Sequence, residues 1–574
     1  MMLALLVIVP LAGGFLAWFL DRWDPRWSRW TSLAASLGGF GLTLGIWARH
    51  FAGSTAVPSG RWLAQTDVAW IPQLNIRFHL AVDGLSLIML MLTFVLTALA
   101  VMASWKGVTA RVGFFHFHLM WAAAALAGVF LALDLVLFYF FFEMMLVPLY
   151  FLIALWGHER RVRAAVKFFI YTQAAGLLML VASIGLYFIH GRATGSYTFD
   201  YLQLLGTSLS SRAGFWLMLG FFVAFAVKLP AIPLHSWLPD AHTEAPTAGS
   251  VILAGLLIKV GAYGMLRFMF PLFPHASFRF ASVGMALGVA GILYGGLLAF
   301  AQTDLKRLVA YTSVSHMGFV LLGIFAWNEL SLQGVILQIV CHAFSTGGLF
   351  IIVGALEERL GTRDLTKMGG LWALVPRFGG STMILAMAAL GLPALGNFVA
   401  EFLILLGTYR VSPPAAIIAS VGLVLATVYS LWMIQRVFHG RLAPEAARSV
   451  AQSRADASPA SMQQRRAAGR PSGAASKTSP GRRMPDLSAR EIAMMAVCVI
   501  VILWLGLYPQ TFIRTAKPTV DSLQQLAIPA TSTTVPTAVT ISARGTRAAA
   551  VPLGGEATNL TKEASSKSLF EAKR

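Results

Sequence analysis

The sequence predicts an all-α membrane protein with about fourteen transmembrane helices, and its composition and its long apolar runs indicate this fold class. The chain has 574 residues, of which 57% are hydrophobic and only 12% are charged, and its mean hydropathy is +0.71. Soluble globular proteins carry roughly 25% charged residues. Apolar runs of about 20 residues, long enough to cross a ~30 Å hydrocarbon core, follow one another from Met1 to Tyr508. These properties exclude an ordinary soluble enzyme.

The apolar runs are predicted to be helices rather than strands of a membrane barrel. They lack the alternation of polar and apolar side chains that a barrel needs, and an open sheet cannot satisfy its backbone in lipid. The first run has no basic residues at its start, which favours a transmembrane helix over a cleaved signal peptide. The predicted spans are 1–20, 31–47, 84–103, 113–132, 135–156, 167–189, 214–234, 247–266, 280–300, 308–326, 331–356, 379–405, 414–435 and 491–508.

The positive charge is concentrated in two hydrophilic segments. The net charge of the chain is +20, and segment 441–490 carries ten Lys and Arg against three Asp and Glu, whereas segment 509–574 carries eight against four. Both segments are rich in Ala, Ser, Thr, Pro and Arg, a composition that predicts disorder. The excess charge therefore indicates no basic face, and no nucleic-acid partner is predicted.

The basic residues of the short loops predict the orientation of the chain. An even number of spans places both termini on one side of the membrane. The loops after odd-numbered spans hold 15 Lys and Arg, and those after even-numbered spans hold 8. The positive-inside rule then predicts that both termini face the periplasm or its equivalent and that segment 441–490 is cytoplasmic.

The sequence contains no motif for a bound redox cofactor, a metal or a nucleophile. Cys341 and Cys498 both lie inside apolar runs, without CxxC or metal-like spacing. There is no P-loop, no GxGxxG opening a helix, no HExxH and no GxSxG. We therefore expect that this chain itself binds neither a cofactor nor a metal.

Two predicted helices contain proline-bearing interruptions. Lys-Leu-Pro-Ala-Ile-Pro occupies 228–233 in the seventh span, and Gly-Leu-Pro-Ala-Leu-Gly occupies 391–396 in the twelfth. Because proline removes a donor and clashes with the preceding turn, both helices should open within the membrane, as in transporter sites. The pairs Asp134-Leu135 and Asp304-Leu305 fit an internal five-helix repeat, but from these residues alone a repeat and a chance similarity are equally supported.

Several ionisable side chains fall near the middle of predicted spans, where each charge costs at least ~2.5 to 3.5 kcal/mol. Histidine titrates close to neutral pH and suits an intermediate carrier. In a buried Glu–Lys pair, separation sets the proton affinity of both groups, so the series predicts a proton-transfer chain. The candidate residues are Glu143, Lys228, Lys259, His316, His342 and Glu401.

Simpler explanations exist for each group. Glu143 and Lys228 could form a structural ion pair, and His316 and His342 could be packed histidines that bond to a neighbouring helix. Residues at the ends of spans are expected to be caps or interface residues: Asp83, Asp134 and Asp304. His116 and His118 are expected to be packing residues. The set His235, Asp240, His242 and Glu244 imitates a metal cluster, but its place beyond the seventh-span interruption favours a turn or a point of proton uptake.

Three stretches resemble a known family. They are Phe-Glu-Met-Met-Leu-Val-Pro-Leu-Tyr-Phe-Leu-Ile-Ala-Leu-Trp-Gly at 142–157, the segment 228–246, and Gly-Leu-Pro at 391–393 followed by Glu401. They resemble the antiporter-like membrane subunits of respiratory complex I. Within that family the Glu-Met-Met-Leu-Val-Pro sequence is typical of one branch rather than of its sister chains L and N. The resemblance covers roughly 1–440 and 488–512.

This resemblance implies two inverted five-helix repeats with broken helices 7 and 12. The implied divisions are helices 1 to 3 in 1–112, repeats in 113–270 and 279–440, the loop 441–490, helix 14 in 491–508, and the tail 509–574. The loop and the tail depart from the family pattern. Residue by residue, Glu143 matches the helix 5 glutamate, Lys228 and Lys259 the lysines of helices 7 and 8, His316 and His342 the central histidines, and Glu401 the helix 12 glutamate.

The function implied is proton translocation in a bacterial inner membrane, as a subunit of NADH:quinone oxidoreductase. FMN, iron–sulfur clusters and quinone would then belong to partner subunits, and the sister chains L and N, small membrane chains and an NADH-oxidising arm would be the partners. The alternatives are a subunit of a sodium/proton antiporter, the membrane subunit of a hydrogenase, and a membrane scaffold with residual ion pairs.

Overall fold

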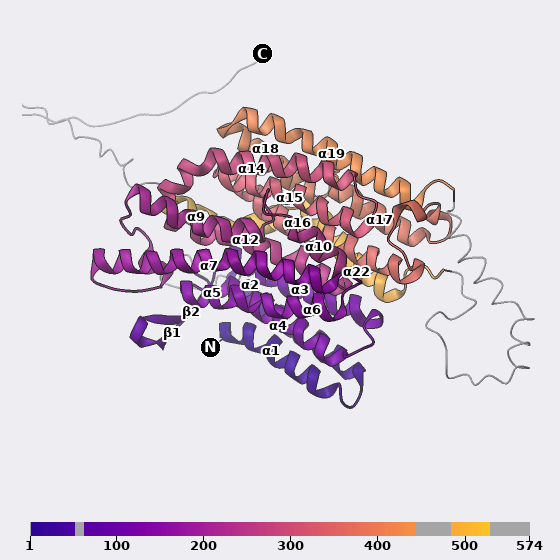
Figure 1. The fold of residues 1–574 in the computed structure, drawn as a ribbon, viewed down its shortest axis with the longest axis horizontal. Coiled ribbons are helices and arrows are strands. Elements are labelled where there is room, and N and C mark those ends of the chain that lie inside the picture. The colour runs from indigo at the N-terminus through magenta and orange to yellow at the C-terminus, as the bar shows by residue number, and fades with distance from the viewer. Residues whose placement is uncertain (1, 52–61, 442–483, 528–574) are drawn as a thin grey trace, which may run out of the picture. The chain divides into compact units, whose positions relative to one another are not determined.

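The computed structural model describes residues 2–51, 62–441 and 484–527, and the helical bundle predicted from the sequence is confirmed over these ranges (Figure 1). Thirteen helices among the described residues are long and apolar enough to cross a membrane. The twelfth predicted span is missing from that set because it is divided into two shorter helices, Pro376–Ala389 (α17) and Gly396–Val411 (α18). Most of segment 441–490 and the tail beyond Ala527 lie outside the described residues.

The remaining helices follow the predicted order. The first part of the chain forms α1 (Met2–Leu20), α2 (Pro25–Phe51), α3 (Gly84–Gly107), α4 (Val112–Leu131), α5 (Leu135–Met144), α6 (Leu146–Trp156), α7 (Arg161–Thr194), α8 (Tyr201–Leu204), α9 (Ser211–Lys228) and α10 (Trp237–Glu244). The second part forms α11 (Thr247–Ile252), α12 (Ile258–Gly264), α13 (Phe270–Leu272), α14 (Pro274–Phe300), α15 (Leu305–Ala326), α16 (Glu329–Leu360), α19 (Pro413–Phe438), α22 (Ala489–Leu507) and α23 (Gln510–Ala527). Two π-helical turns, η2 (Leu253–Leu257) and η3 (Met265–Met269), flank α12.

Several elements were not predicted, among them the short helices α8 and α10. Strands β1 (Ala64–Ile71) and β2 (Ile76–Val82) form an antiparallel hairpin, with Asn75 in the left-handed region at the turn. The helix α23 lies in the first part of the tail that was expected to be disordered. It buries Thr515, Ala516, Thr519, Val520 and Leu523, which recur at helical spacing, so packing of one face orders this segment.

Three transmembrane helices are interrupted. Between α9 and α10, the indole Nε1 of Trp237 donates to the carbonyl of Val227 at 2.9 Å and so satisfies a group near the end of α9. The chain also leaves the helix between α17 and α18, and it kinks between α5 and α6. At this last point Pro148 has no N–H to donate to the carbonyl of Met144, four residues earlier. Glu143 therefore lies directly before a helix break.

A pair of backbone bridges recurs at two places in the bundle. Leu135 N donates to Phe199 O at 2.9 Å and Tyr201 N to Leu133 O at 2.8 Å. In the second half, Leu305 N donates to Arg363 O at 3.0 Å and Leu365 N to Thr303 O at 2.8 Å. The first bridge lies at the start of α5, beside the hairpin, and the second lies at the opposite end of the bundle. The two bridges hold the first turns of α5 and α15 in the same way.

Helices α14 and α15 pack backbone against backbone. A methyl group added at Gly288 would lie 2.8 Å from Leu322 N, and one added at Gly295 would lie 2.7 Å from Ser315 N. Only glycine permits so close an approach. The contact holds the middle of α15 firmly in place, next to His316.

Candidate functional site

Glu143 and Lys228 form the first part of the site, which we name the first pair. Lys228 is the last residue of α9 and is fully buried, with its Nζ 4.7 Å from the centre of the Phe142 ring. Neither carboxylate oxygen of Glu143 nor the ammonium of Lys228 has a hydrogen-bond partner among the described residues. Their opposite charges nevertheless interact electrostatically.

Gly176 of α7 makes room for the Glu143 carboxylate. A Cβ atom at position 176 would overlap Oε1 of Glu143. The carboxylate is therefore pressed against the backbone of a neighbouring helix, beside the kink between α5 and α6. The glycine is one determinant of the position of Glu143 that the sequence analysis did not identify.

Lys259 begins the second part of the site. It lies in α12 between the two π-helical turns, is fully buried, and donates from Nζ to the carbonyl of Ala254. The same Nζ is 2.7 Å from Nδ1 of His342 in α16. Because an ammonium has no acceptor, Nδ1 of His342 must carry the lone pair when Lys259 is charged. The lone pair on Nδ1 can therefore accept a proton from the Lys259 ammonium.

His316 and Glu401 complete this part. The ring centres of His342 and His316 are 5.5 Å apart. Nδ1 of His316, in α15, is 2.8 Å from Oε1 of Glu401, in α18. All of these side chains are at most 1% exposed. Lys259, His342, His316 and Glu401 therefore form a buried row of two bonded pairs with neighbouring imidazole rings, which we name the second row.

Two residues that the sequence analysis missed bind members of the second row. Gln338 of α16 donates from Nε2 to Oε1 of Glu401 at 2.6 Å, and the hydroxyl of Tyr429 in α19 is 3.3 Å from Nε2 of His316. His316 is therefore held on both ring nitrogens. The only signal in the sequence was a polar residue inside an apolar run, which is weak for a neutral side chain.

The structure brings together four of the six predicted residues and leaves the first pair apart from them. Within the described ranges, no hydrogen bond or ion pair joins Lys228 to Lys259. The site thus has two separate parts, one without hydrogen bonds from protein groups and one with them.

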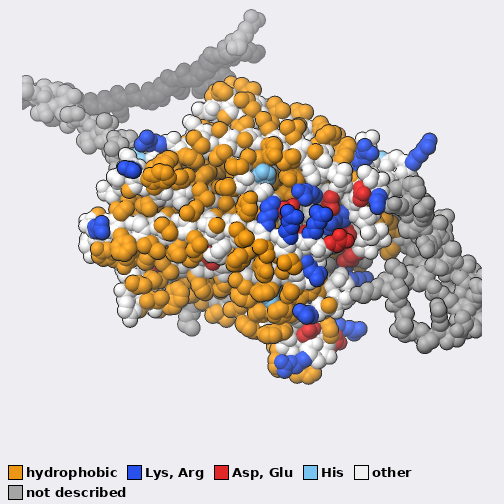
Figure 2. Space-filling view, in the orientation of Figure 1, with side chains coloured by type: hydrophobic (Ala, Val, Ile, Leu, Met, Phe, Trp, Pro, Cys, Tyr) orange, Lys and Arg blue, Asp and Glu red, His pale blue; other side chains and the backbone are white. Residues whose placement is uncertain are grey.

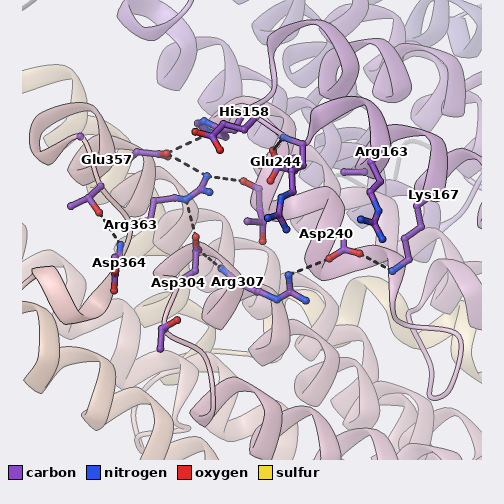
Figure 3. Close-up of a pocket in the computed structure, with 17 residues that line it drawn as sticks. His158, Arg163, Lys167, Asp240, Glu244, Asp304, Arg307, Glu357, Arg363 and Asp364 are labelled. Carbon is purple, nitrogen blue, oxygen red and sulfur yellow. Dashed lines mark hydrogen bonds and ion pairs between the residues drawn. The ribbon is translucent and has the colours of Figure 1, made fainter.

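A charged hollow lies at the end of the bundle opposite the hairpin. Its volume is about 830 Å³, and Figure 2 shows its acidic and basic side chains as one patch on a largely hydrophobic face. Arg363 connects its walls by ion pairs to Asp304 at 3.0 Å and Glu357 at 3.3 Å, as Figure 3 shows. Glu357 also lies 3.6 Å from Nε2 of His158. Burial, then the positive charges of Lys306 and Arg363, lower the pKa of His158 to about 4.

Comparison with known proteins identifies the family. Residues 132–427, more than half of the chain, match the transmembrane family described as NADH:quinone oxidoreductase/Mrp antiporter. The chain belongs to this family. Its curated relatives include the NADH-quinone oxidoreductase subunit M of Escherichia coli K12, 46% identical over 544 residues, which are 93% of this chain and all of that one. The subunit M of Pseudomonas aeruginosa PAO1 is 48% identical over 533 residues, covering 92% and 98%. These relatives place the chain in the subunit M branch.

Solved structures agree with this assignment. A chain of respiratory complex I from Thermus thermophilus with bound NADH superposes with a TM-score of 0.76 at 29% identity, covering 92% of this chain and 99% of that one. A chain of the Mrp complex from Dietzia sp. DQ12-45-1b gives a TM-score of 0.74 at 23% identity, covering 92% and 100%. The second match shows a shared fold.

The three aspartates at helix ends cap their helices in this chain, as the sequence predicted. Asp83 accepts from Ser86 N, Asp134 from Val136 N and Leu137 N, and Asp304 from Arg307 N. Asp83 also forms a fully buried ion pair with Arg267, with 2.6 Å contacts to both carboxylate oxygens, which the sequence analysis did not foresee.

Among the described residues, the other histidines and acids singled out from the sequence do not form a metal-ligand cluster. His116 and His118 are buried in α4, where His118 contacts the carbonyl of Phe114, so the packing interpretation is confirmed. Asp240 pairs with Lys167 and Arg307, Glu244 accepts from Arg160 N, and His242 stacks on Phe350 with ring centres 4.6 Å apart. No group of three possible metal ligands gathers within the described part of the chain.

Proposed function

We propose that this chain is the proton-translocating subunit M of an NADH:quinone oxidoreductase, and that it moves protons through Glu143, Lys228, Lys259, His342, His316 and Glu401. The family and its subunit M relatives support the enzyme assignment. The chain supplies no redox chemistry in this proposal. Its contribution is to carry protons across the membrane while partner subunits oxidise NADH and reduce quinone.

The first pair acts as the switch in this proposal. Protons from the cytoplasm reach Lys228, whose proton affinity depends on its separation from Glu143. A close carboxylate holds the proton on the lysine, and a distant one lets desolvation release it. The absence of hydrogen bonds from described protein groups to either side chain suits a pair whose separation changes.

The second row carries the proton onward. Lys259 passes a proton to His342, and His316 delivers it to Glu401 for release on the other side. The observation that carries the proposal is this buried row, with 2.7 Å and 2.8 Å contacts at its two ends and ring centres 5.5 Å apart in its middle. Burying four ionisable groups in a membrane is unfavourable in free energy. A purely structural role does not explain why the chain keeps them.

The setting of the chain is part of the proposal. We infer a bacterial inner membrane, with both termini in the periplasm and the basic loop in the cytoplasm, from the loop charges. Sister chains L and N would be neighbours in the membrane arm. FMN, iron–sulfur clusters and quinone would be bound by partner subunits, and this chain would bind none of them.

The decisive experiment replaces Lys228 with Ala in the assembled complex. We expect NADH-driven proton uptake by inverted membrane vesicles to fall at least about tenfold, because a positioned proton carrier contributes a factor of that order or more. Lys517→Ala is the matched control, since Lys517 is exposed on α23. Normal pumping by assembled Lys228→Ala complex would refute the path through the first pair.

A second measurement tests the redox setting. A C-terminally tagged chain, solubilised mildly, should co-purify with NADH:quinone oxidoreductase activity and with flavin and iron–sulfur subunits. Recovery of hydrophobic antiporter subunits alone, with sodium-dependent proton transport, would instead assign the chain to a sodium/proton antiporter complex.

A further inference from the structure

Lys306 is a buried lysine that the proposed path does not use. It is the second residue of α15 and is fully buried. Its Nζ donates to the carbonyl of Ala245 at 2.5 Å, at the C-terminal end of α10. A buried ammonium this close to the start of a helix is unfavourable for the helix dipole of α15. Other groups must therefore compensate for its charge.

Three acidic residues of the charged hollow interact with Lys306. Its ammonium interacts electrostatically with the carboxylates of Glu357, Asp304 and Glu244, which all line that hollow. The side chain of Glu357 is 20% exposed and can exchange protons with water. Arg363 forms an ion pair with Glu357 at 3.3 Å, and Nε2 of His158 lies 3.6 Å from the same carboxylate (Figure 3).

His242 is a second buried group that interacts with Lys306. His242 is fully buried in α10, and neither ring nitrogen has a hydrogen-bond partner among the residues described. The imidazole lies within electrostatic range of both Lys306 and Lys259. Ionisable groups thus extend from the hollow to Lys259 without passing Lys228.

We propose that Lys306 is a further proton-transfer residue, which receives protons from Glu357 in the hollow and passes them through His242 to Lys259. The second row then has its own point of proton uptake, separate from the first pair. In each cycle the Lys306 ammonium gives one proton to His242, and the neutral amine regains one from the Glu357 carboxyl group. This inference rests on the proposed function of the second row.

A structural role for Lys306 makes a different prediction. If its ammonium only caps the carbonyl of Ala245, arginine can replace it, because guanidinium also donates hydrogen bonds and keeps the charge. Guanidinium cannot release its proton in a protein. Lys306→Arg therefore separates a cap from a carrier.

The test compares Lys306→Arg, Lys306→Met and Glu357→Gln in the whole complex. Lys167→Met is the matched control, because Lys167 lines the same hollow and donates to Ser236 O and Asp240. For a carrier, all three variants should lower NADH-driven proton uptake at least about fivefold, a modest part of what a positioned proton carrier supplies, whereas Lys167→Met should stay near the parent.

The outcomes decide between the two roles. Full pumping by assembled Lys306→Arg complex would overturn the inference and leave a cap. If neither Lys306 variant assembles, Glu357→Gln decides: reduced uptake supports the route and normal uptake overturns it. Lys228→Ala, measured alongside, separates the proposals. Normal pumping in that variant refutes the path through the first pair, whereas loss of pumping there beside intact Lys306→Arg pumping refutes only the second route.

Discussion

The first pair and the second row both bury ionisable side chains, but they differ in how these side chains are hydrogen bonded. Glu143 and Lys228 are buried with no hydrogen bond from described protein groups, whereas His316 is bonded through both ring nitrogens to Glu401 and Tyr429. A bonded network fixes its geometry, which favours repeated transfer along one line. A pair without such bonds can change its separation at little cost. In the proposed path, this difference favours switching in the first pair and conduction in the second row.

The backbone around the first pair and around the two histidines of the second row agrees with this division. The first pair lies at two helix interruptions, after Glu143 and after Lys228. His316 and His342 lie inside the continuous helices α15 and α16. Interrupted helices can shift one half against the other, whereas continuous helices carry their side chains as rigid bodies.

The largest expected effect compares Glu401→Gln with Glu143→Gln. Glutamine at 401 cannot carry a proton, so we expect protons pumped per NADH to fall at least about tenfold. Glutamine at 143 leaves Lys228 in place but removes the negative charge that sets its proton affinity. We expect protons pumped per NADH to fall roughly two- to fivefold. Proton uptake and NADH oxidation measured together in vesicles give the ratio.

Equal losses of protons pumped per NADH in Glu401→Gln and Glu143→Gln would contradict the proposed division between conduction and switching. A full retention of coupled turnover in Glu143→Gln would remove the switching role from the first pair. Assembly of each variant is checked by co-purification of the NADH-oxidising subunits.

An intermediate effect is expected for Gly176→Ala. The new methyl group would displace the Glu143 carboxylate from α7, and we expect coupled quinone reduction to fall about threefold, since misplacing a proton-transfer group forfeits part of its rate. Gly185→Ala in the same helix is the control, because its methyl group would meet only the flexible end of Leu217. Similar behaviour of the two variants would show that the position of Glu143 is not critical.

The smallest effect concerns His158, which lies outside both parts of the site. Its pKa is lowered to about 4 from an ordinary value of 6.5. The neutral imidazole therefore contributes stability that is fully present above pH 6.5 and is lost as the pH falls through 4. We expect the thermal midpoint of the purified complex to drop by roughly 1 °C more in this window than in His158→Gln complex. His275→Gln, at an exposed site, should behave like the parent.

The sequence predicted the spans and the six ionisable candidates because both depend on single-residue properties. Apolar length decides a span, and a charge inside it is conspicuous. The hairpin was missed because strands of seven and eight residues hardly register beside spans of about 20. The helix α23 was missed because its apolar face alternates with Lys517, Asp521 and several glutamines, which resembles a disordered tail by composition.

The polar partners in the site could not be predicted for a different reason. Gln338 and Tyr429 are separated from Glu401 and His316 by 63 and 113 residues along the chain, and only the packing of α15, α16, α18 and α19 brings them together. Lys306 reads as an ordinary loop-end lysine in the sequence. Its burial depends on the carbonyl of Ala245, which the interruption after α9 places within reach.

The glycine contacts between α14 and α15 determine which parts can move during turnover. With Gly288 and Gly295 seated against the backbone of Leu322 and Ser315, α15 cannot rotate without driving atoms of one helix into the other. His316 is thereby kept at a constant depth in the bundle, within reach of Glu401 and Tyr429. In mechanical terms, α14 and α15 behave as a single rigid post that supports the second row.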